Sequence, residues 1–289
     1  MKPNSFEYVR VDTLNDAIAV LQEHGDDARI LAGGQSLIPA MNMRLALPEV
    51  LVDVSNIGEM HGITIQDGGL RIGAMSRHAE VMKSSKIAEY APLITMAMPN
   101  IAHGAIRNRG TFGGSLCNAD PAAELPACAL ALGVTFNIQG SDGTRSVAAE
   151  DFIDGTYSTC LSDDEILVSV DVPAPEAGAV SFFEELARRK GDYAMAGLAA
   201  HGVLKDGQFT DMRLVFFAVD EMAVRASSAE QLICGKPLSE IDIDAVCAAL
   251  ADDITPFEDL TTSSAAKMVM MQVLTRRTLE KFIAEGAVN

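Results

Sequence analysis

The sequence is poor in several features that would point to other classes of protein. None of its 289 residues is tryptophan, and 22 Lys and Arg stand against 40 Asp and Glu, for a net charge of −18. Nucleic acids and anionic membranes bind clustered positive charge, so this balance opposes both as partners. No stretch approaches the ~20 apolar residues of a membrane span, and no apolar signal-peptide core follows Met1. We therefore expect a cytoplasmic protein without a membrane span.

Cysteine is scarce and scattered. The five cysteines form no C-x-x-C pair and are Cys117, Cys128, Cys160, Cys234 and Cys247. An odd number of dispersed thiols is typical of reduced, mostly buried side chains. Such a set does not supply the clustered ligands of an iron–sulfur centre or a structural zinc. We predict no metal site within this chain.

Motifs of nucleophilic and metal-dependent catalysis are missing as well. There is no G-x-S-x-G and no H-E-x-x-H. The five histidines are dispersed, and only His103 lies near a loop of interest. We predict no catalytic residue.

Two glycine pairs of the chain stand out, in Ala32-Gly33-Gly34-Gln35-Ser36 and Thr111-Phe112-Gly113-Gly114-Ser115, with 80 residues from Gly34 to Gly114; a third pair, in Asp67-Gly68-Gly69, is predicted to form a turn before the strand at 70–74. Consecutive glycines adopt positive φ freely, so main-chain N–H groups can converge on an anion. Each of the first two pairs follows an apolar segment, and a serine stands within one residue of it. The pattern predicts two walls of one diphosphate site; the alternative is two tight turns.

Neither loop matches the common phosphate-binding motifs. No G-x-x-x-x-G-K-[ST] occurs, and neither loop reads G-x-G-x-x-G. A diphosphate would therefore depend on backbone N–H and hydroxyl groups, with Arg107 and Arg109 able to add positive charge. The alternative for both arginines is that water solvates them.

Hydrophobic periodicity divides the chain into three regions. The first predicts a strand–loop–helix–strand unit, with strands at 7–10, 29–32 and 50–54 and a helix from Asp12 or Thr13. The second predicts strands at 70–74, 134–138 and 165–172 and a helix capped by Ser76. It also predicts a helix over 91–101, interrupted or kinked at Pro99, and another over 122–132. After the linker 173–178, the third predicts an α+β pattern of strands at 181–186, 198–204 and 214–219, an Asp206-Gly207 hairpin turn, and helices over 223–233, 242–251 and 264–284.

Polar residues follow the second glycine loop. Asn118, Asp120 and Glu124 stand beside the expected phosphate site. Carboxylates accept hydrogen bonds from hydroxyls, such as those of a dinucleotide. Alternatively, Asp120 before Pro121 caps the next helix.

A basic run ends in an aromatic residue at Arg188-Arg189-Lys190-Gly191-Asp192-Tyr193-Ala194. Its turn could present Tyr193 to a planar ring. The alternative is an exposed basic loop with Tyr193 packed on the sheet.

Together these segments resemble the medium, FAD-binding subunit of molybdenum hydroxylases, the family of carbon monoxide dehydrogenase medium subunits and xanthine dehydrogenase FAD subunits. Residues 32–39 resemble the first FAD loop, 106–115 the second and 189–194 the flavin-side motif, in the order of the family. The similarity runs from about Phe6 to about Phe282.

The resemblance implies an α+β fold. It consists of a p-cresol methylhydroxylase-type FAD-binding domain over residues 1–177, with two α/β subdomains at about 1–58 and 59–177. A C-terminal α+β domain of antiparallel strands and helices follows over 178–289.

The resemblance also implies the FAD contacts. Backbone groups of the two loops would wrap the diphosphate, Asp120 would hold hydroxyls, and Tyr193 would lie near the isoalloxazine. The cofactor-binding set is Ala32, Gly33, Gly34, Gln35, Ser36, Leu37, Ile101, Ala102, Gly110, Thr111, Gly113, Gly114, Ser115, Asn118, Asp120 and Tyr193.

In this family a large subunit holds the molybdenum cofactor and a small subunit holds the iron–sulfur clusters. The resemblance therefore implies an electron-transfer subunit within a heterohexamer that passes electrons to an external acceptor. Gln35 and Ser115 stand where many relatives have His and Asn, and Glu184-Glu185 where some have lysine, which affects the expected potential and acceptor. Two alternatives stay open: a free-standing flavin-dependent oxidoreductase of the same fold and a non-redox nucleotide-binding module.

Overall fold

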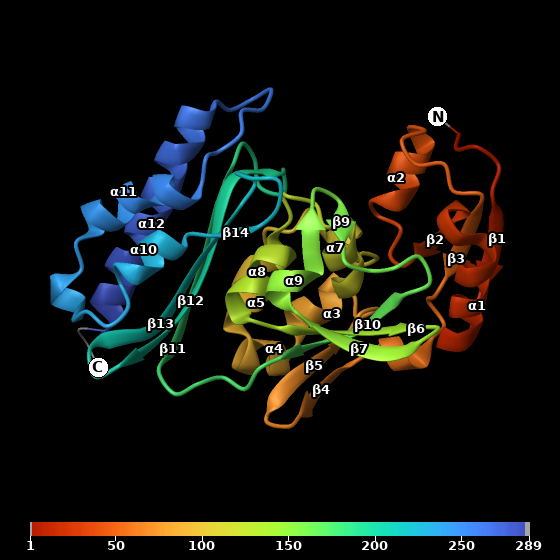
Figure 1. The fold of residues 1–289 in the computed structure, drawn as a ribbon, viewed down its shortest axis with the longest axis horizontal. Coiled ribbons are helices and arrows are strands. Elements are labelled where there is room, and N and C mark those ends of the chain that lie inside the picture. Colours follow the sequence, from red (N-terminus) through yellow and green to blue (C-terminus); the bar gives the residue numbers. More distant parts are fainter. Residues whose placement is uncertain (1, 287–289) are drawn as a thin grey trace.

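The computed structural model describes residues 2–286, which form three larger sheets and one two-stranded hairpin, with helices packed on them (Figure 1). The N-terminal sheet is parallel, in the order β1-β3-β2. Its elements are β1 (Glu7–Arg10), α1 (Leu14–His24), β2 (Ala28–Leu31), α2 (Leu37–Asn42) and β3 (Val50–Asp53). The loop with the first glycine pair joins the carboxyl end of β2 to α2, which is the edge where parallel sheets bind ligands.

Helix α1 illustrates why this unit forms. Thr13 caps it by accepting a hydrogen bond from the Asp16 amide at 3.1 Å. Its apolar residues recur at helical spacing and are buried against the sheet, as predicted: Leu14, Ala17, Ile18 and Leu21.

The middle region is built on an antiparallel sheet in the order β4-β5-β10-β6-β7. Its strands, with the small hairpin β8-β9, are β4 (Ile63–Gln66), β5 (Gly69–Gly73), β6 (Thr135–Gly140), β7 (Gly143–Ala148), β8 (Ile153–Gly155), β9 (Ser158–Thr159) and β10 (Ile166–Val172). The helices are α3 (His78–Lys83), α4 (Ser85–Tyr90), α5 (Pro92–Ala97), α6 (Gly104–Arg107), α7 (Phe112–Asn118), α8 (Glu124–Leu132) and α9 (Ala149–Phe152).

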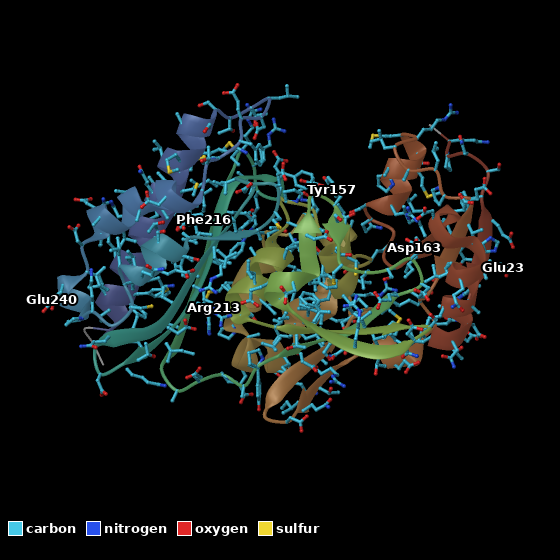
Figure 2. All side chains as sticks on the ribbon, in the orientation of Figure 1. Glu23, Tyr157, Asp163, Arg213, Phe216 and Glu240 are labelled. Atoms are coloured by element: carbon cyan, nitrogen blue, oxygen red, sulfur yellow. The ribbon has the colours of Figure 1, made fainter. Side chains whose placement is uncertain are left out.

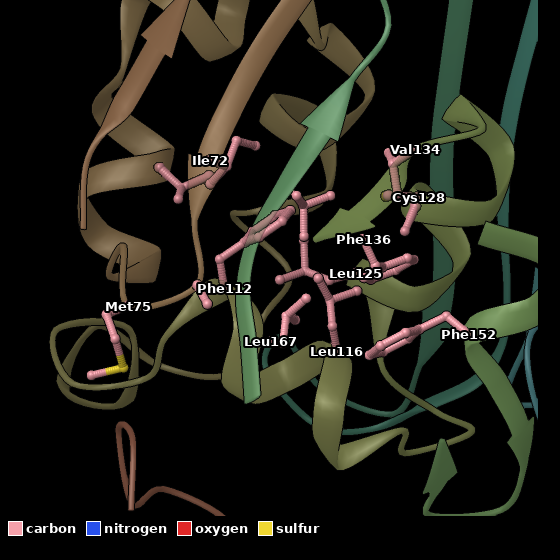
Figure 3. Close-up of a cluster of buried hydrophobic side chains, with 14 of the residues drawn as sticks. Ile72, Met75, Phe112, Leu116, Leu125, Cys128, Val134, Phe136, Phe152 and Leu167 are labelled. Carbon is pink, nitrogen blue, oxygen red and sulfur yellow. The ribbon is translucent and has the colours of Figure 1, made fainter. Parts of the chain in front are cut away.

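The core of this region lies beneath the second glycine pair (Figure 3). Phe112 and Leu116 of α7 are buried in it, beside Leu125 of α8. The rings of Phe136 and Phe152 stack with their centroids 3.8 Å apart. Burial of these side chains fixes α7, and with it the loop from which α7 begins.

The C-terminal region is a four-stranded antiparallel sheet, β11 (Ala179–Ala187), β12 (Ala194–Lys205), β13 (Gln208–Phe217) and β14 (Val224–Arg225). One face is covered by α10 (Ser227–Gln231), α11 (Ile243–Asp253) and α12 (Ser264–Gly286), the other by α5 and α8 (Figure 1). The expected Asp206-Gly207 turn joins β12 to β13, with positive φ at both residues.

Strand β12 contributes to two hydrophobic cores. Leu198 and Ala200 face the core under α10–α12, and Ala199 faces the core shared with α8. Small residues on the α8 side allow the helix to approach closely. The sheet is therefore buried on both faces and connects the two halves of the chain.

The architecture agrees with the predicted α+β class. The three sheets use residues 7–53, 63–172 and 179–225, which is compatible with the predicted subdomain and domain limits; those limits stay predictions.

Three local predictions differ from the structure. Helix α5 ends at Ala97 instead of continuing to residue 101. Pro99 has no backbone N–H to donate to a helical carbonyl, and its ring clashes with the preceding turn. Ser76 caps no helix; its hydroxyl donates to the Gly62 carbonyl at 3.1 Å. The expected helix over 223–233 is divided, because Val224 and Arg225 pair with β13 as an edge strand.

The close approach at β12 generates a test. A Cβ on Gly197 would overlap the ring of the fully buried Phe217. We expect Gly197→Ala to lower the free energy of unfolding by about 1–3 kcal/mol, measured by urea denaturation. Gly58→Ala is the control, since a Cβ there meets nothing within 4 Å; equal stability of the two variants would contradict the packing argument.

Candidate functional site

The two glycine loops, far apart in sequence, lie against each other. A Cβ on Gly33 would overlap the Arg109 carbonyl oxygen and come within 2.8 Å of the Gly110 Cα. A Cβ on Gly114 would lie 3.6 Å from the Ala32 Cβ. The glycines thus allow a backbone-to-backbone contact that larger residues would prevent.

The first loop leaves its amides available. Within residues 2–286, the N–H groups of Gly33, Gly34, Gln35, Ser36 and Leu37 donate to no protein atom. Gly34 has φ +70°, and the Gln35 side-chain amide donates back to the Gly33 carbonyl at 3.1 Å. A run of unengaged amides at the start of a helix fits an anion.

The second loop differs from the prediction that its amides also face the diphosphate. Phe112 N–H donates to the Ser76 carbonyl at 2.9 Å, and Gly113 N–H to the Ala74 carbonyl at 2.8 Å. Gly114 N–H donates to the Thr111 hydroxyl at 3.2 Å. These amides shape the loop against β5, while Gly113 allows contact with Ala74.

A buried histidine supports the second loop. His78, 5% exposed, has its Nε2 2.9 Å from the Thr111 carbonyl, and its amide donates to the Gly110 carbonyl. Burial lowers the pKa of His78 to about 4, so the ring is neutral near pH 7. The sequence analysis missed His78, since only tertiary structure brings it to this loop.

Arg107 has a different role from the one expected. Its guanidinium donates to the carbonyls of Ile101 and Ala102, at 2.7 and 2.8 Å. Ala102 has φ +44°, so these bonds hold a strained backbone in place. Arg109 is exposed and makes no ion pair in the part of the chain that the structure describes.

The basic loop after β11 lies against this same segment. A Cβ on Gly191 would come within 2.7 Å of the His103 Cε1 and 3.1 Å of the Ala102 carbonyl oxygen. Tyr193 is 73% exposed. The alternative that Tyr193 packs on the sheet is therefore wrong.

Asp120 lies in a turn rather than at a helix cap. Its Oδ1 accepts from the Ala122 amide at 3.0 Å, and α8 begins only at Glu124 with Ala123 as its cap. The capping alternative is wrong. Tyr193 and Tyr157 both keep most of their surface exposed, and partial burial followed by the charge of Asp120 raises the pKa of both phenols.

Tyr157 is a further neighbour, and no sequence motif predicted it. It lies in the β8-β9 hairpin, where its amide donates to the Ala119 carbonyl at 3.1 Å (Figure 2). Burial and then Asp120 raise its pKa to about 12.

Two carboxyl groups lie between α8 and β11. Burial, together with the charges of Glu185 and Asp120, raises the pKa of Glu124 to about 8. Burial raises the pKa of Glu185 to about 7, and its Oε2 has no hydrogen-bond partner among the described residues. Glu184 lies on the opposite face of β11, where it pairs with Arg277 of α12.

The structure therefore brings the three sequence motifs into one region. The two loops are in contact, Ile101-Ala102 joins the second loop to the basic loop, and Asp120 lies near Tyr193. Asn118 ends α7 beside this group, and Ser36 is exposed at the start of α2. Within residues 2–286 no cluster of three His, Cys, Asp or Glu fits a metal ion, and no helix is long and apolar enough to cross a membrane.

Comparison with known proteins agrees with this geometry. Residues 4–175 match the FAD binding domain in molybdopterin dehydrogenase, and residues 181–282 match the CO dehydrogenase flavoprotein C-terminal domain. These matches define a flavoprotein of two domains.

Individual relatives extend over almost the whole chain. The 6-hydroxypseudooxynicotine dehydrogenase complex subunit alpha of Paenarthrobacter nicotinovorans is 36% identical over 97% of this chain and 95% of its own. The carbon monoxide dehydrogenase medium chain of Afipia carboxidovorans is 36% identical over 97% and 98%. A carbon monoxide dehydrogenase structure from Hydrogenophaga pseudoflava matches with TM-score 0.93 and 35% identity, over 96% of each chain.

The chain belongs to the family of FAD-binding subunits of molybdenum hydroxylases. It is the flavoprotein subunit of a multi-subunit, molybdenum-dependent oxidoreductase, with FAD as its cofactor.

The partly buried carboxyl pair Glu124 and Glu185 predicts a pH dependence. Folding raises the pKa of Glu124 and Glu185 above the ordinary 4.5, so the folded state binds more protons and stability falls as pH rises from about 4.5 to about 8. In the Glu124→Gln/Glu185→Gln variant we expect the free energy of unfolding to fall by roughly 2 kcal/mol less over this pH range than in the wild type. Urea unfolding of the FAD-free chain at a series of pH values measures it.

Glu184→Gln is the matched control, since its side chain is one residue away on the other face. An unchanged pH slope in the double variant would show that the two carboxyls ionise normally in the folded state.

Proposed function

We propose that FAD lies across the contact between the two glycine loops, with its diphosphate on the first loop. The observation that carries this proposal is the run of unengaged amides from Gly33 to Leu37, held against the backbone of Arg109 and Gly110. The donor set fits a diphosphate, because it supplies N–H groups at a helix start and no carboxylate.

The other predicted residues have distinct roles in this proposal. Asp120 accepts hydrogen bonds from cofactor hydroxyls, and Tyr193 lies beside the isoalloxazine. Arg107 holds the carbonyls of Ile101 and Ala102, so that this segment keeps its shape along the cofactor. When bound, FAD accepts and donates electrons singly or in pairs, which joins one-electron and two-electron partners.

The partners are a large subunit with the molybdenum cofactor and a small subunit with iron–sulfur clusters. This chain takes electrons from the clusters and passes them to an external acceptor, in a heterohexamer in the cytoplasm. Supporting this, relatives of similar length bear the names medium chain or complex subunit. The large subunit would select the substrate.

The first experiment is a visible absorption spectrum of the purified chain, before and after addition of FAD and then dithionite, with affinity capture of co-expressed partners. A bound, reducible flavin together with two captured subunits supports the proposal. Bound flavin without partners favours the free-standing oxidoreductase, and no bound flavin favours the non-redox nucleotide-binding module.

The loop contact predicts the effect of a single methyl group. Gly33→Ala places a Cβ against the Arg109 carbonyl and forces the two loops apart. We expect FAD affinity to fall at least ~10-fold, or ~1.4 kcal/mol, in fluorescence titrations of the FAD-free chain. Gly58→Ala should bind normally; wild-type affinity in Gly33→Ala would refute the shared diphosphate site.

The exposure of Tyr193 predicts a kinetic effect. Because the phenol lies at the ring rather than on the diphosphate, Tyr193→Ala should change the rate of flavin reduction by dithionite more than FAD affinity. Stopped-flow absorbance and titration measure the two. Tyr8→Ala, in the N-terminal sheet, serves as control, and an unchanged rate would leave Tyr193 without a role at the ring.

A further inference from the structure

A lysine of the C-terminal region is almost completely buried. Lys267, in the first turn of α12, is 1% exposed, and its Nζ lies 2.8 Å from the Asp259 carboxylate and 3.7 Å from the centre of the Phe257 ring. The hydrogen bond from Lys267 holds the pKa of Asp259 well below its usual range. A buried ammonium group is costly unless its N–H groups make hydrogen bonds. The Lys267 Nζ donates one of these bonds to the Ala218 carbonyl at 2.7 Å.

Ala218 is held from both sides. It follows β13 directly and has φ +62°, a left-handed conformation that alanine rarely adopts. Lys267 holds its carbonyl, and its amide donates to the Pro121 carbonyl at 2.8 Å. The strained conformation lets one residue connect α12 to the segment before α8.

Pro121 follows Asp120 in the turn at the proposed FAD site. The Asp120 carboxylate accepts from the Ala122 amide and its carbonyl accepts from the Ala123 amide, both at 3.0 Å. The turn is therefore internally fixed, and its attachment to Ala218 sets where the whole turn lies. The loop after Ala218 is also attached to the β8-β9 hairpin, since the Thr156 hydroxyl donates to the Glu221 carbonyl at 3.0 Å.

We infer that Lys267 is a positioning residue for the FAD site, which orients the Asp120 turn through Ala218 and Pro121. Through Lys267, the C-terminal region contributes to cofactor binding without a direct contact between this side chain and the cofactor. This inference rests on the proposed role of Asp120 with the hydroxyls of FAD.

The competing explanation is that Lys267 only stabilises the C-terminal core. A double-mutant cycle on FAD affinity separates the two, because residues that act through each other give non-additive effects. Lys267→Met keeps the volume of the side chain and removes its charge. We expect it to raise the Kd for FAD about tenfold, with Lys267→Met/Asp120→Asn no weaker than Asp120→Asn alone. Lys267→Met/Ser36→Ala should instead show the product of its two single effects.

Arg277→Met is the control, since it removes an ion pair between α12 and the sheet that has no connection to Pro121; its Kd should equal that of the wild type. If Lys267→Met fails to fold, as judged by near-ultraviolet circular dichroism, the cycle is run with Asp259→Asn, for which the same coupling is expected. A wild-type Kd, or effects that multiply with Asp120→Asn and Ser36→Ala alike, would overturn the inference. Failure of the wild-type chain to bind FAD would instead overturn the proposed function.

Discussion

The backbone contact between the two glycine loops is the constraint on which the site depends. Gly33 lies so near Arg109 and Gly110 that the first loop has only one position relative to the second. The second loop is in turn fixed from below by Phe112 and from the side by His78. Hydrogen bonding is therefore divided between the loops: the second loop uses its amides to build the fold, and the first leaves its amides without a protein acceptor, as the proposed diphosphate site requires. Rigidity on one side makes the open amides of the other side a preorganised site.

The sheet of the C-terminal region has a similar double function. Both of its faces are buried, and α5 and α8 of the FAD-binding part pack against one of them. The interface between this sheet and the helices α5 and α8, which we call the seam, also contains Glu124, Glu185 and the peptide of Ala218. A carboxyl pair without a cation would be strongly unfavourable if both groups were ionised, and proton uptake relieves that cost. The seam is apolar where it holds the fold and polar where it borders Asp120 and Tyr193.

The sequence predicted what local patterns encode. Helix α1, the Asp206-Gly207 turn and the last helix, predicted over 264–284, follow from periodicity and turn chemistry. The glycine loops could be proposed as a site because two pairs occur with the same arrangement, after an apolar segment and before a serine, although a glycine pair alone also fits a tight turn. It could not be predicted that the amides of the second loop donate within the protein while those of the first do not. That difference depends on the carbonyls of Ser76 and Ala74, which only the tertiary structure brings to the second loop. The same holds for His78 and Tyr157, whose neighbours are more than 30 residues away in the chain.

The acidic character of the chain also acquires a physical explanation at the site. Arg107, the cation nearest in sequence to the second loop besides Arg109, is used on two carbonyls, and the carboxylates of Glu124 and Glu185 lie in the seam rather than at the loops. Backbone amides carry only partial charges, so they bind a diphosphate without the long-range field of lysines and arginines. A site of this kind keeps its affinity in a strongly negative protein because the donors act at contact distance, where orientation matters more than net charge. In the proposed site the position of the cofactor therefore depends on the course of the backbone, which is set by the glycine contacts, by the left-handed Ala218 and by the buried Lys267.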